Sequence, residues 1–425
     1  MTRLSPDDAW KEIFEKYSIL EAIEKDSSYV ITSQKINEFH EARLMTKFDS
    51  SAQLLKIFKE NDLAILPLTR GSYTIGRFSA YCKLDYPTSP PIEVLPPDCQ
   101  SLDYTNLYSE SAALSFAFNS GIIYDIMQDD SARFTVNGRM SSGAFSFSIN
   151  GLAAHSSYTI SIQNSQIEID AGYEGHETFC IVEAKNIAPA DFLIRQLYYP
   201  YRLWCSKLTK PILCVFLIYS NDIFTAFKYK FEDLLQYNSL NLLAVKRYAI
   251  ASEPITLQDV STVHDNIVSL EEPKLQFPQA NSFERVIDLL SILADHDLSR
   301  DETTARYEFN ERQTNYYSDA CRYLGLVEKY VDQNSVMYKL TPLARKIMSK
   351  RHKEKILELI RIIFTRPIFY YAFRAVLVGA SIPSDDKLVD IFSRNKPAIA
   401  INEPTVRRRI STVKSWLEWF LRQCE

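Results

Sequence analysis

QIEIDAGYEGHETFCIVEAKN, residues 166–186, is the stretch that decides the fold of this chain. Its first five residues alternate polar and apolar side chains. Ile167 and Ile169 therefore point to one face of a strand, and Glu168 and Asp170 point to the other. The glycine-containing run that follows predicts a turn, so this strand is expected to pair with the next extended segment.

The second strand, residues 178–185, is apolar and β-branched until it ends in Glu183-Ala184-Lys185. By the same period of two, Glu183 and Lys185 share a face while Ala184 points away. If the two strands are neighbours, three carboxylates and one lysine meet at one end of a sheet.

That combination has a chemical use. Mg²⁺ is held by a few carboxylates together with water and phosphate oxygens, and Asp170 and Glu183 could supply them, with the carbonyl of Ala184 as a third oxygen. Lys185 could bond a water or a phosphate in a field that lowers the pKa of the water. The alternative is an ordinary strand pair with exposed acids.

Asp170, a gap of twelve residues and then Glu183-Ala184-Lys185 resemble the signature of the PD-(D/E)XK nuclease superfamily, seen in type II restriction endonucleases. Ile169 stands where many members have proline. The resemblance implies that Asp170 and Glu183 ligate Mg²⁺ with the Ala184 carbonyl, and that Lys185 orients water and stabilises charge.

The resemblance also points to assisting residues. Glu168, or Glu110 on an expected helix over 109–127, would assist the reaction; Glu110 could equally be a first-turn acid that favours the helix dipole. Related nucleases carry Gln and Tyr on the helix after the lysine. Gln196 fits this pattern, but Pro200 stands where the tyrosine is usual.

The order of expected elements matches an α/β (α+β) core with a mixed sheet. A buried central strand is expected at 211–219, with 223–231 as its hairpin partner, and turns are expected at Asn137-Gly138 and Asn150-Gly151. The remaining elements of the core are a helix at 109–127, strands at 134–136, 144–149 and 158–162, and a helix at 191–203.

The 425 residues predict more than one domain, and 24% charged residues are ordinary for a globular protein. Seven scattered cysteines without a CxxC pair indicate reduced thiols and no zinc site, and no run of apolar residues reaches membrane-spanning length. We therefore expect a cytoplasmic protein that does not bind membranes.

Three regions are expected. Residues 1–85 form a helix-turn-helix-like DNA-binding domain, 86–275 an endonuclease domain that starts with a proline-rich linker, and 276–425 a winged-helix DNA-binding region. The net charge is −5, but residues 282–425 hold 24 Lys and Arg against 19 Asp and Glu. Such a local surplus of positive charge favours contact with phosphate backbones.

Candidate DNA contacts lie in both flanking regions, and each could instead be solvated surface. The helix expected at 403–417 resembles a recognition helix, since its arginines could grip phosphates or guanine. The candidates are Arg43, Lys47 and Arg70 in the first region, and Arg312, Asn315, Arg322, Arg407, Arg408 and Lys414 in the last.

These features predict a sequence-specific double-stranded DNA endonuclease of the type II restriction class that uses Mg²⁺. The resemblance implies a homodimer, because two strands must be cut. Two alternatives stay open: a non-catalytic winged-helix DNA-binding regulator, and a nuclease that acts on structured or damaged DNA.

Overall fold

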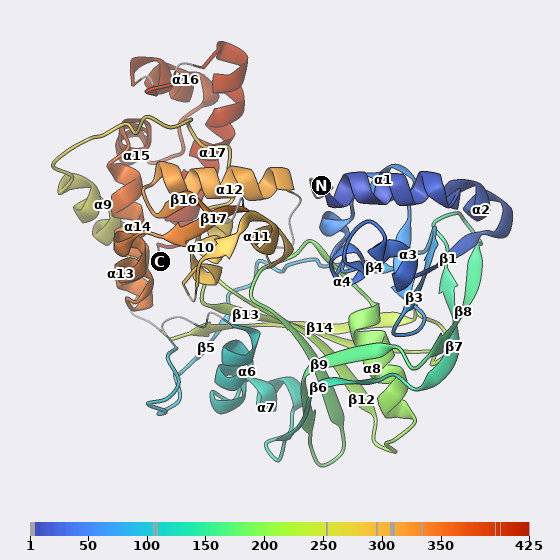
Figure 1. Ribbon diagram of the computed structural model, residues 1–425. Coiled ribbons are helices and arrows are strands. Elements are labelled where there is room, and N and C mark those ends of the chain that lie inside the picture. The colour runs from blue at the N-terminus through green and yellow to red at the C-terminus, as the bar shows by residue number, and fades with distance from the viewer. Residues whose placement is uncertain are drawn as a thin grey trace. The chain divides into compact units, whose positions relative to one another are not determined.

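The computed structural model describes residues 5–104, 107, 109–251, 254–294, 296–306, 311–332, 335–395, 397–399 and 401–424 (Figure 1). The chain forms two compact units. The first unit comprises Met1–Val94, Ala117–Tyr219 and Ile223–Ala249, and the second comprises Leu95–Phe116, Ser220–Asp222 and Ile250–Glu425.

A seven-stranded mixed sheet is the centre of the first unit. Its strands, in sheet order, are β5 (Ile92–Val94), β14 (Leu240–Ile250), β13 (Ile223–Phe231), β12 (Ile212–Ser220), β10 (Phe179–Lys185), β9 (Gln166–Glu174) and β6 (Arg133–Ser141). β10 pairs in parallel with β12 and antiparallel with β9. The mixed α+β class is therefore as expected, and the apolar run of β12 is explained by its central place in the sheet.

Helix α8 (Arg195–Cys205) packs against β9 and β10. It buries one side, including Leu197, Tyr199 and Leu203, in the main core of the unit, and it continues through Pro200. The helix begins later than expected because Asp191–Leu193 forms a short strand, β11, that pairs with β4 (Tyr81–Lys83).

The first 76 residues of this unit have a core of their own, centred on Trp10, Phe14 and Phe58. Three antiparallel strands follow the order β1-β3-β2 behind short helices. The first two helices of this region are separated at Ser18, which is left-handed with φ 46°. The elements are α1 (Pro6–Lys16), α2 (Ile19–Asp26), β1 (Ser28–Thr32), α3 (Ser33–Asn37), α4 (Ala42–Met45), the 3-10 turn η1 (Ser51–Gln53), α5 (Lys56–Glu60), β2 (Ala64–Pro67) and β3 (Ser72–Gly76).

Several sequence-based expectations for the middle of the chain were wrong. Asn137-Gly138 is not a turn but lies inside β6, and the proline-rich stretch contributes the sheet strand β5. The single helix expected at 109–127 is two helices, α6 (Glu110–Asn119) and α7 (Ile122–Met127), separated at Gly121, whose φ is +85°. The strands β7 (Ala144–Asn150) and β8 (Ser157–Gln163) form a separate two-stranded ribbon.

The second unit is mainly helical, with one three-stranded antiparallel sheet of order β15-β17-β16. Residues 256–279, expected to be irregular, contain helix α9. The elements are α9 (Leu257–Asp265), α10 (Phe283–Ile292), β15 (Leu298–Ser299), α11 (Arg300–Arg306), α12 (Glu311–Tyr323), β16 (Val327–Asp332), β17 (Ser335–Leu340), α13 (Pro342–Met348), α14 (His352–Phe364), α15 (Pro367–Gly379), α16 (Asp385–Arg394) and α17 (Glu403–Arg422).

In the part of the chain that the structure describes, no single helix combines the length and apolar character needed to cross a membrane. α14 and α15 meet that requirement only as a pair, which bends by 109° at the break between them.

Candidate active site

The two strands that carry the acidic motif are neighbours, as predicted. The antiparallel ladder between β9 and β10 runs from Glu174 and Phe179 to Ala171 and Val182. One step further along, the carboxylate of Asp170 accepts the backbone N–H of Ala184, at 2.8 Å. The Asp170 side chain thus accepts a hydrogen bond that a main-chain carbonyl would accept if the ladder continued. The bond holds Asp170 beside the backbone of Ala184, the residue after Glu183.

The position of Asp170 has a local cause on the other side of β9. Gly172 is paired with Val136 of β6, and the next pair is Ile169 with Gly138, so Asp170 and Ala171 together face one residue of β6. This extra residue is a β-bulge, which re-aims the side chains at that point in the strand. Asp170 is half-buried there, whereas Ile169 is buried in the sheet core.

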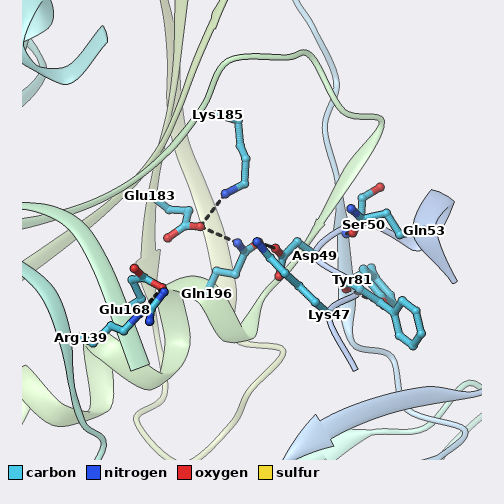
Figure 2. A network of polar contacts seen from close by, with 11 residues as sticks. Lys47, Asp49, Ser50, Gln53, Tyr81, Arg139, Glu168, Glu183, Lys185 and Gln196 are labelled. Carbon is cyan, nitrogen blue, oxygen red and sulfur yellow. Dashed lines mark hydrogen bonds and ion pairs between the residues drawn. The ribbon is translucent and has the colours of Figure 1, made fainter. Parts of the chain in front are cut away.

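Glu183 is the centre of a compact polar cluster (Figure 2). Its Oε1 accepts a hydrogen bond from Nε2 of Gln196 on α8 and lies 2.7 Å from Nζ of Lys185. The side chains of Glu183 and Lys185 are only 10% and 11% exposed. A buried carboxylate must be paired and hydrogen-bonded, and both of these partners were expected from the sequence.

The oxygen donors at this strand end are of the type that Mg²⁺ accepts in proteins. Two carboxylates, from Asp170 and Glu183, are held at one strand end with the carbonyl of Ala184 in the same segment, and Mg²⁺ characteristically takes few protein oxygens and keeps several waters. Oε1 of the buried Gln196 has no hydrogen-bond partner in the structure, so it can accept from a bound water.

Of the other two predicted acids, Glu168 does not join this group. Glu168 is about half exposed and pairs with Arg139 of β6 at 3.3 Å, and Figure 2 draws that pair without a bond to Glu183. Glu110 is the first residue of α6 and belongs to the second unit. No cluster of three or more Asp, Glu, His or Cys residues that could hold a metal occurs among the described residues.

A segment of the N-terminal region lies against β11, just before α8, which the sequence did not predict. The N–H of Leu193 donates to the carbonyl of Asp49 at 2.7 Å, and the carboxylate of Asp191 accepts from Ser51 N at 2.7 Å and from the Ser50 hydroxyl at 3.1 Å. Figure 2 shows residues of this segment in the same view as Gln196 and Glu183. No periodicity or motif in the sequence relates this segment to Asp191.

The same segment is fixed by a buried tyrosine. The Tyr81 hydroxyl donates to the carbonyl of Phe48 at 3.1 Å. Burial, together with the nearby Asp191 and Asp49 carboxylates, raises the pKa of Tyr81 well above its usual range. The hydroxyl therefore stays a donor at any physiological pH and fixes the backbone next to Lys47.

The candidate DNA contacts of the first unit are exposed. Arg43 lies on α4, and Arg70 lies in the turn between β2 and β3. Lys47 is exposed and lies 3.5 Å from Asp49, so it extends from the segment that packs beside β11. These cations occur on three separate elements of this unit.

The candidates of the second unit lie on two helices. On α12, Arg322 pairs with Asp319 at 2.8 Å, Arg312 donates to Tyr316 at 2.7 Å, and Asn315 is half-buried. The other helix, α17, exposes Arg407 and Arg408. Lys414 is paired with Asp385 at 2.6 Å.

The apolar side of α17 includes the buried residues Trp416, Trp419 and Phe420, so most of this helix is part of the core of the second unit. Its first two turns present Arg407, which lies 3.6 Å from Glu403, and Arg408, which donates to the Thr405 hydroxyl at 3.2 Å. The interpretation of 403–417 as a recognition helix is therefore limited to Arg407 and Arg408.

Three protein families match the chain, and each is described as a domain of unknown function. They are DUF6996 over residues 7–75, DUF6997 over 76–249 and DUF7226 over 285–425. No curated protein and no solved structure matches. Asp170, Glu183, Lys185 and Gln196 all lie in the second of these ranges.

Proposed function

We propose that this chain is a Mg²⁺-dependent endonuclease that cuts double-stranded DNA at specific sequences, in the manner of type II restriction enzymes. One observation carries the proposal. Asp170 and Glu183 are held at the end of one strand pair, and Lys185 lies 2.7 Å from Glu183. Two acids and an amine at a strand end are the parts that hydrolysis of a phosphodiester requires.

The roles of the residues follow from their contacts. Asp170 and Glu183, with the carbonyl of Ala184, would hold the ion, which when bound neutralises phosphate charge and acidifies a water. Gln196 fixes the orientation of the Glu183 carboxylate from α8. The Lys185 ammonium has three donors, so it can keep Glu183 and still bond a phosphate oxygen or the attacking water.

The flanking modules support a DNA substrate. Each module has short helices and a three-stranded sheet in which the third strand lies between the first and the second. This arrangement resembles that of winged-helix DNA-binding modules. In that arrangement, α12 of the second unit would be the helix that enters the major groove, and it carries Arg312, Asn315 and Arg322. We propose that these modules select the sequence and that a homodimer cuts both strands.

The test is digestion of plasmid DNA with Mg²⁺, followed by sequencing of the ends. The wild type should give discrete bands with uniform ends. Glu183→Gln and Lys185→Ala should each bind DNA and lose at least about a thousandfold in cleavage rate, because they remove charge stabilisation at the reacting phosphate.

Two control variants match these changes on the same sheet. Glu168→Gln removes an exposed acid that pairs with Arg139, and Lys210→Ala removes a lysine that pairs with Glu174 at 2.7 Å. Both should cut like the wild type. DNA binding without any cleavage would favour the regulator, and cleavage only at branches or ends would favour the structure-specific nuclease.

A further inference from the structure

A cavity of about 590 Å³ lies in the second unit, at the start of α14, separate from the candidate active site in sequence and composition. Its wall includes four charged residues at the start of α14 and one residue that precedes β13. These residues are Arg351, Lys353, Glu354, Lys355 and Asp222. This volume is within the range of pockets that hold small organic ligands. None of the functional roles assigned above involves this cavity.

The deepest cation in the wall is Lys355. It is only 4% exposed, and its ammonium lies 3.0 Å from the carboxylate of Asp222. The imidazole of His352 contacts the same carboxylate through Nδ1. Two basic groups therefore share one carboxylate. Because Asp222 compensates the two basic groups incompletely, a second anion in the cavity would be favoured there.

The rim adds one charge of each sign. Arg351 and Glu354 are both exposed and both line the cavity. Arg351 occupies the N-cap position of α14, whose first turn receives no side-chain capping bond, so the backbone N–H groups there add to the positive potential. An anion is thus favoured by Arg351 and opposed by Glu354.

Lys353 also lines the cavity, but its ammonium pairs with Asp259 at 3.0 Å, and the rest of the wall is apolar or aromatic. Ile250, Ala251 and Leu357 provide aliphatic surface, and Tyr104 provides a ring with a polar end. A bare inorganic anion would leave this surface in contact with water. The lining therefore suits a ligand that combines an anionic end with a flat apolar body.

We propose that this cavity binds a phosphomonoester carried on a nucleoside, with the phosphate at Arg351, His352 and Lys355 and the base against Tyr104 and Leu357. The phosphomonoester can belong to a free nucleotide or to the 5′ end of a DNA strand. The site is independent of the proposed cleavage reaction, because binding can be read without DNA cleavage or metal.

The test is calorimetric titration of the full chain with AMP, adenosine, inorganic phosphate and a 5′-phosphorylated duplex, in the absence of Mg²⁺. AMP should bind more tightly than phosphate, and adenosine should bind most weakly. Tight binding by AMP points to a free nucleotide. Tighter binding by the duplex than by its unphosphorylated form, with weak AMP binding, points to a strand end.

Neighbouring substitutions of opposite sign make the test specific. Arg351→Gln should weaken binding about fivefold, and Glu354→Gln should tighten it about twofold, because each changes one rim charge. Arg361→Gln, on the same helix but paired with Glu358 at 2.7 Å, is the matched control and should change nothing. Arg351→Gln and Glu354→Gln alter exposed side chains, so folding is preserved.

Absence of binding by AMP, phosphate and the phosphorylated end would overturn the proposal. So would binding that is equal in the wild type, Arg351→Gln and Glu354→Gln. Lys355→Met tests the deep position, and it should weaken binding more than Arg351→Gln does.

Discussion

Glu183 shows how single residues define this site. Its carboxylate is buried, and it is held between an amide from a helix and an ammonium two residues along its own strand. Such a group costs free energy to bury and adds little net stability even when it is paired, so a structural role alone does not account for it. The sequence placed Glu183 and Lys185 on one face of a strand because a period of two is a local pattern, and it named Gln196 only through the resemblance to a nuclease motif.

At the same scale, two acids of the second unit, the buried Asp288 and the half-buried Glu272, have raised pKa values. Burial raises the pKa of Asp288 to about 7, although the Ser220 hydroxyl donates to it at 2.9 Å. Burial also raises the pKa of Glu272 to about 7. Both groups are neutral in the folded chain below that pH and carry a penalty above it.

The variant Asp288→Asn isolates the cost of ionising Asp288 in the folded chain. The folded state holds a proton on Asp288 that the unfolded state has already released, so wild-type stability falls as the pH rises from about 4 towards 7. The variant lacks this loss. Its stability relative to the wild type should rise with pH across that window, by at most about 1.4 kcal/mol per unit.

Denaturant unfolding of both proteins between pH 4 and pH 8 measures this difference. Glu272 titrates equally in both proteins, so the comparison cancels it. A difference in stability that does not change with pH would show that Asp288 is charged in the folded state.

At the scale of elements, the strands were easier to predict than the turns. β9, β10, β12 and β13 have strong periodicity or continuous apolar runs, and the sequence placed all four within a few residues. Asn137-Gly138 is typical of a hairpin turn, yet it lies inside β6 because Gly138, with φ +90°, faces the bulge of β9. Pairing between distant strands decided this, and no local pattern contains that information.

The contact between the N-terminal segment and β11 was equally hidden, since Ser50 and Asp191 are 141 residues apart. Asp191→Asn should loosen it, because the amide cannot accept from all the donors that surround the carboxylate. The expected cost is about 2 kcal/mol for hydrogen bonds to a charged group. Hydrogen exchange at residues 50–55 should become faster.

The control for this change is Asp85→Asn. Asp85 is 80% exposed and pairs only at the surface with Lys83, so its loss should cost less than about 1 kcal/mol. Equal exchange rates in the wild type and Asp191→Asn would mean that the segment is held by packing alone.

At the scale of the whole molecule, charge is distributed unevenly, and much of it is already used. Of the basic residues at 342–374, Lys350, Arg361, Lys353 and Lys355 are all paired with acids. The surplus that the sequence suggested for DNA binding in this segment is therefore smaller than its composition indicates. Arg407 and Arg408 of α17 are better candidates, because both are exposed and the acid that pairs with Arg407, Glu403 at 3.6 Å, is itself exposed.

Replacing both arginines by glutamine should weaken DNA binding at every sequence rather than at one site. Each phosphate contact contributes about one unit to the slope of log affinity against log salt, so the double variant should reduce the slope by about two. Fluorescence anisotropy over a salt series measures it. An unchanged slope would exclude this helix from the interface.

The central claim is that Asp170 and Glu183 form a site for a divalent ion, and titration with Mn²⁺ as a spectroscopic substitute for Mg²⁺ tests it most directly. The wild type should bind Mn²⁺ in competition with Mg²⁺. Asp170→Asn and Glu183→Gln should each weaken that binding at least about tenfold, while Glu168→Gln should leave it unchanged. Equal Mn²⁺ binding by the wild type and both site variants would contradict the account.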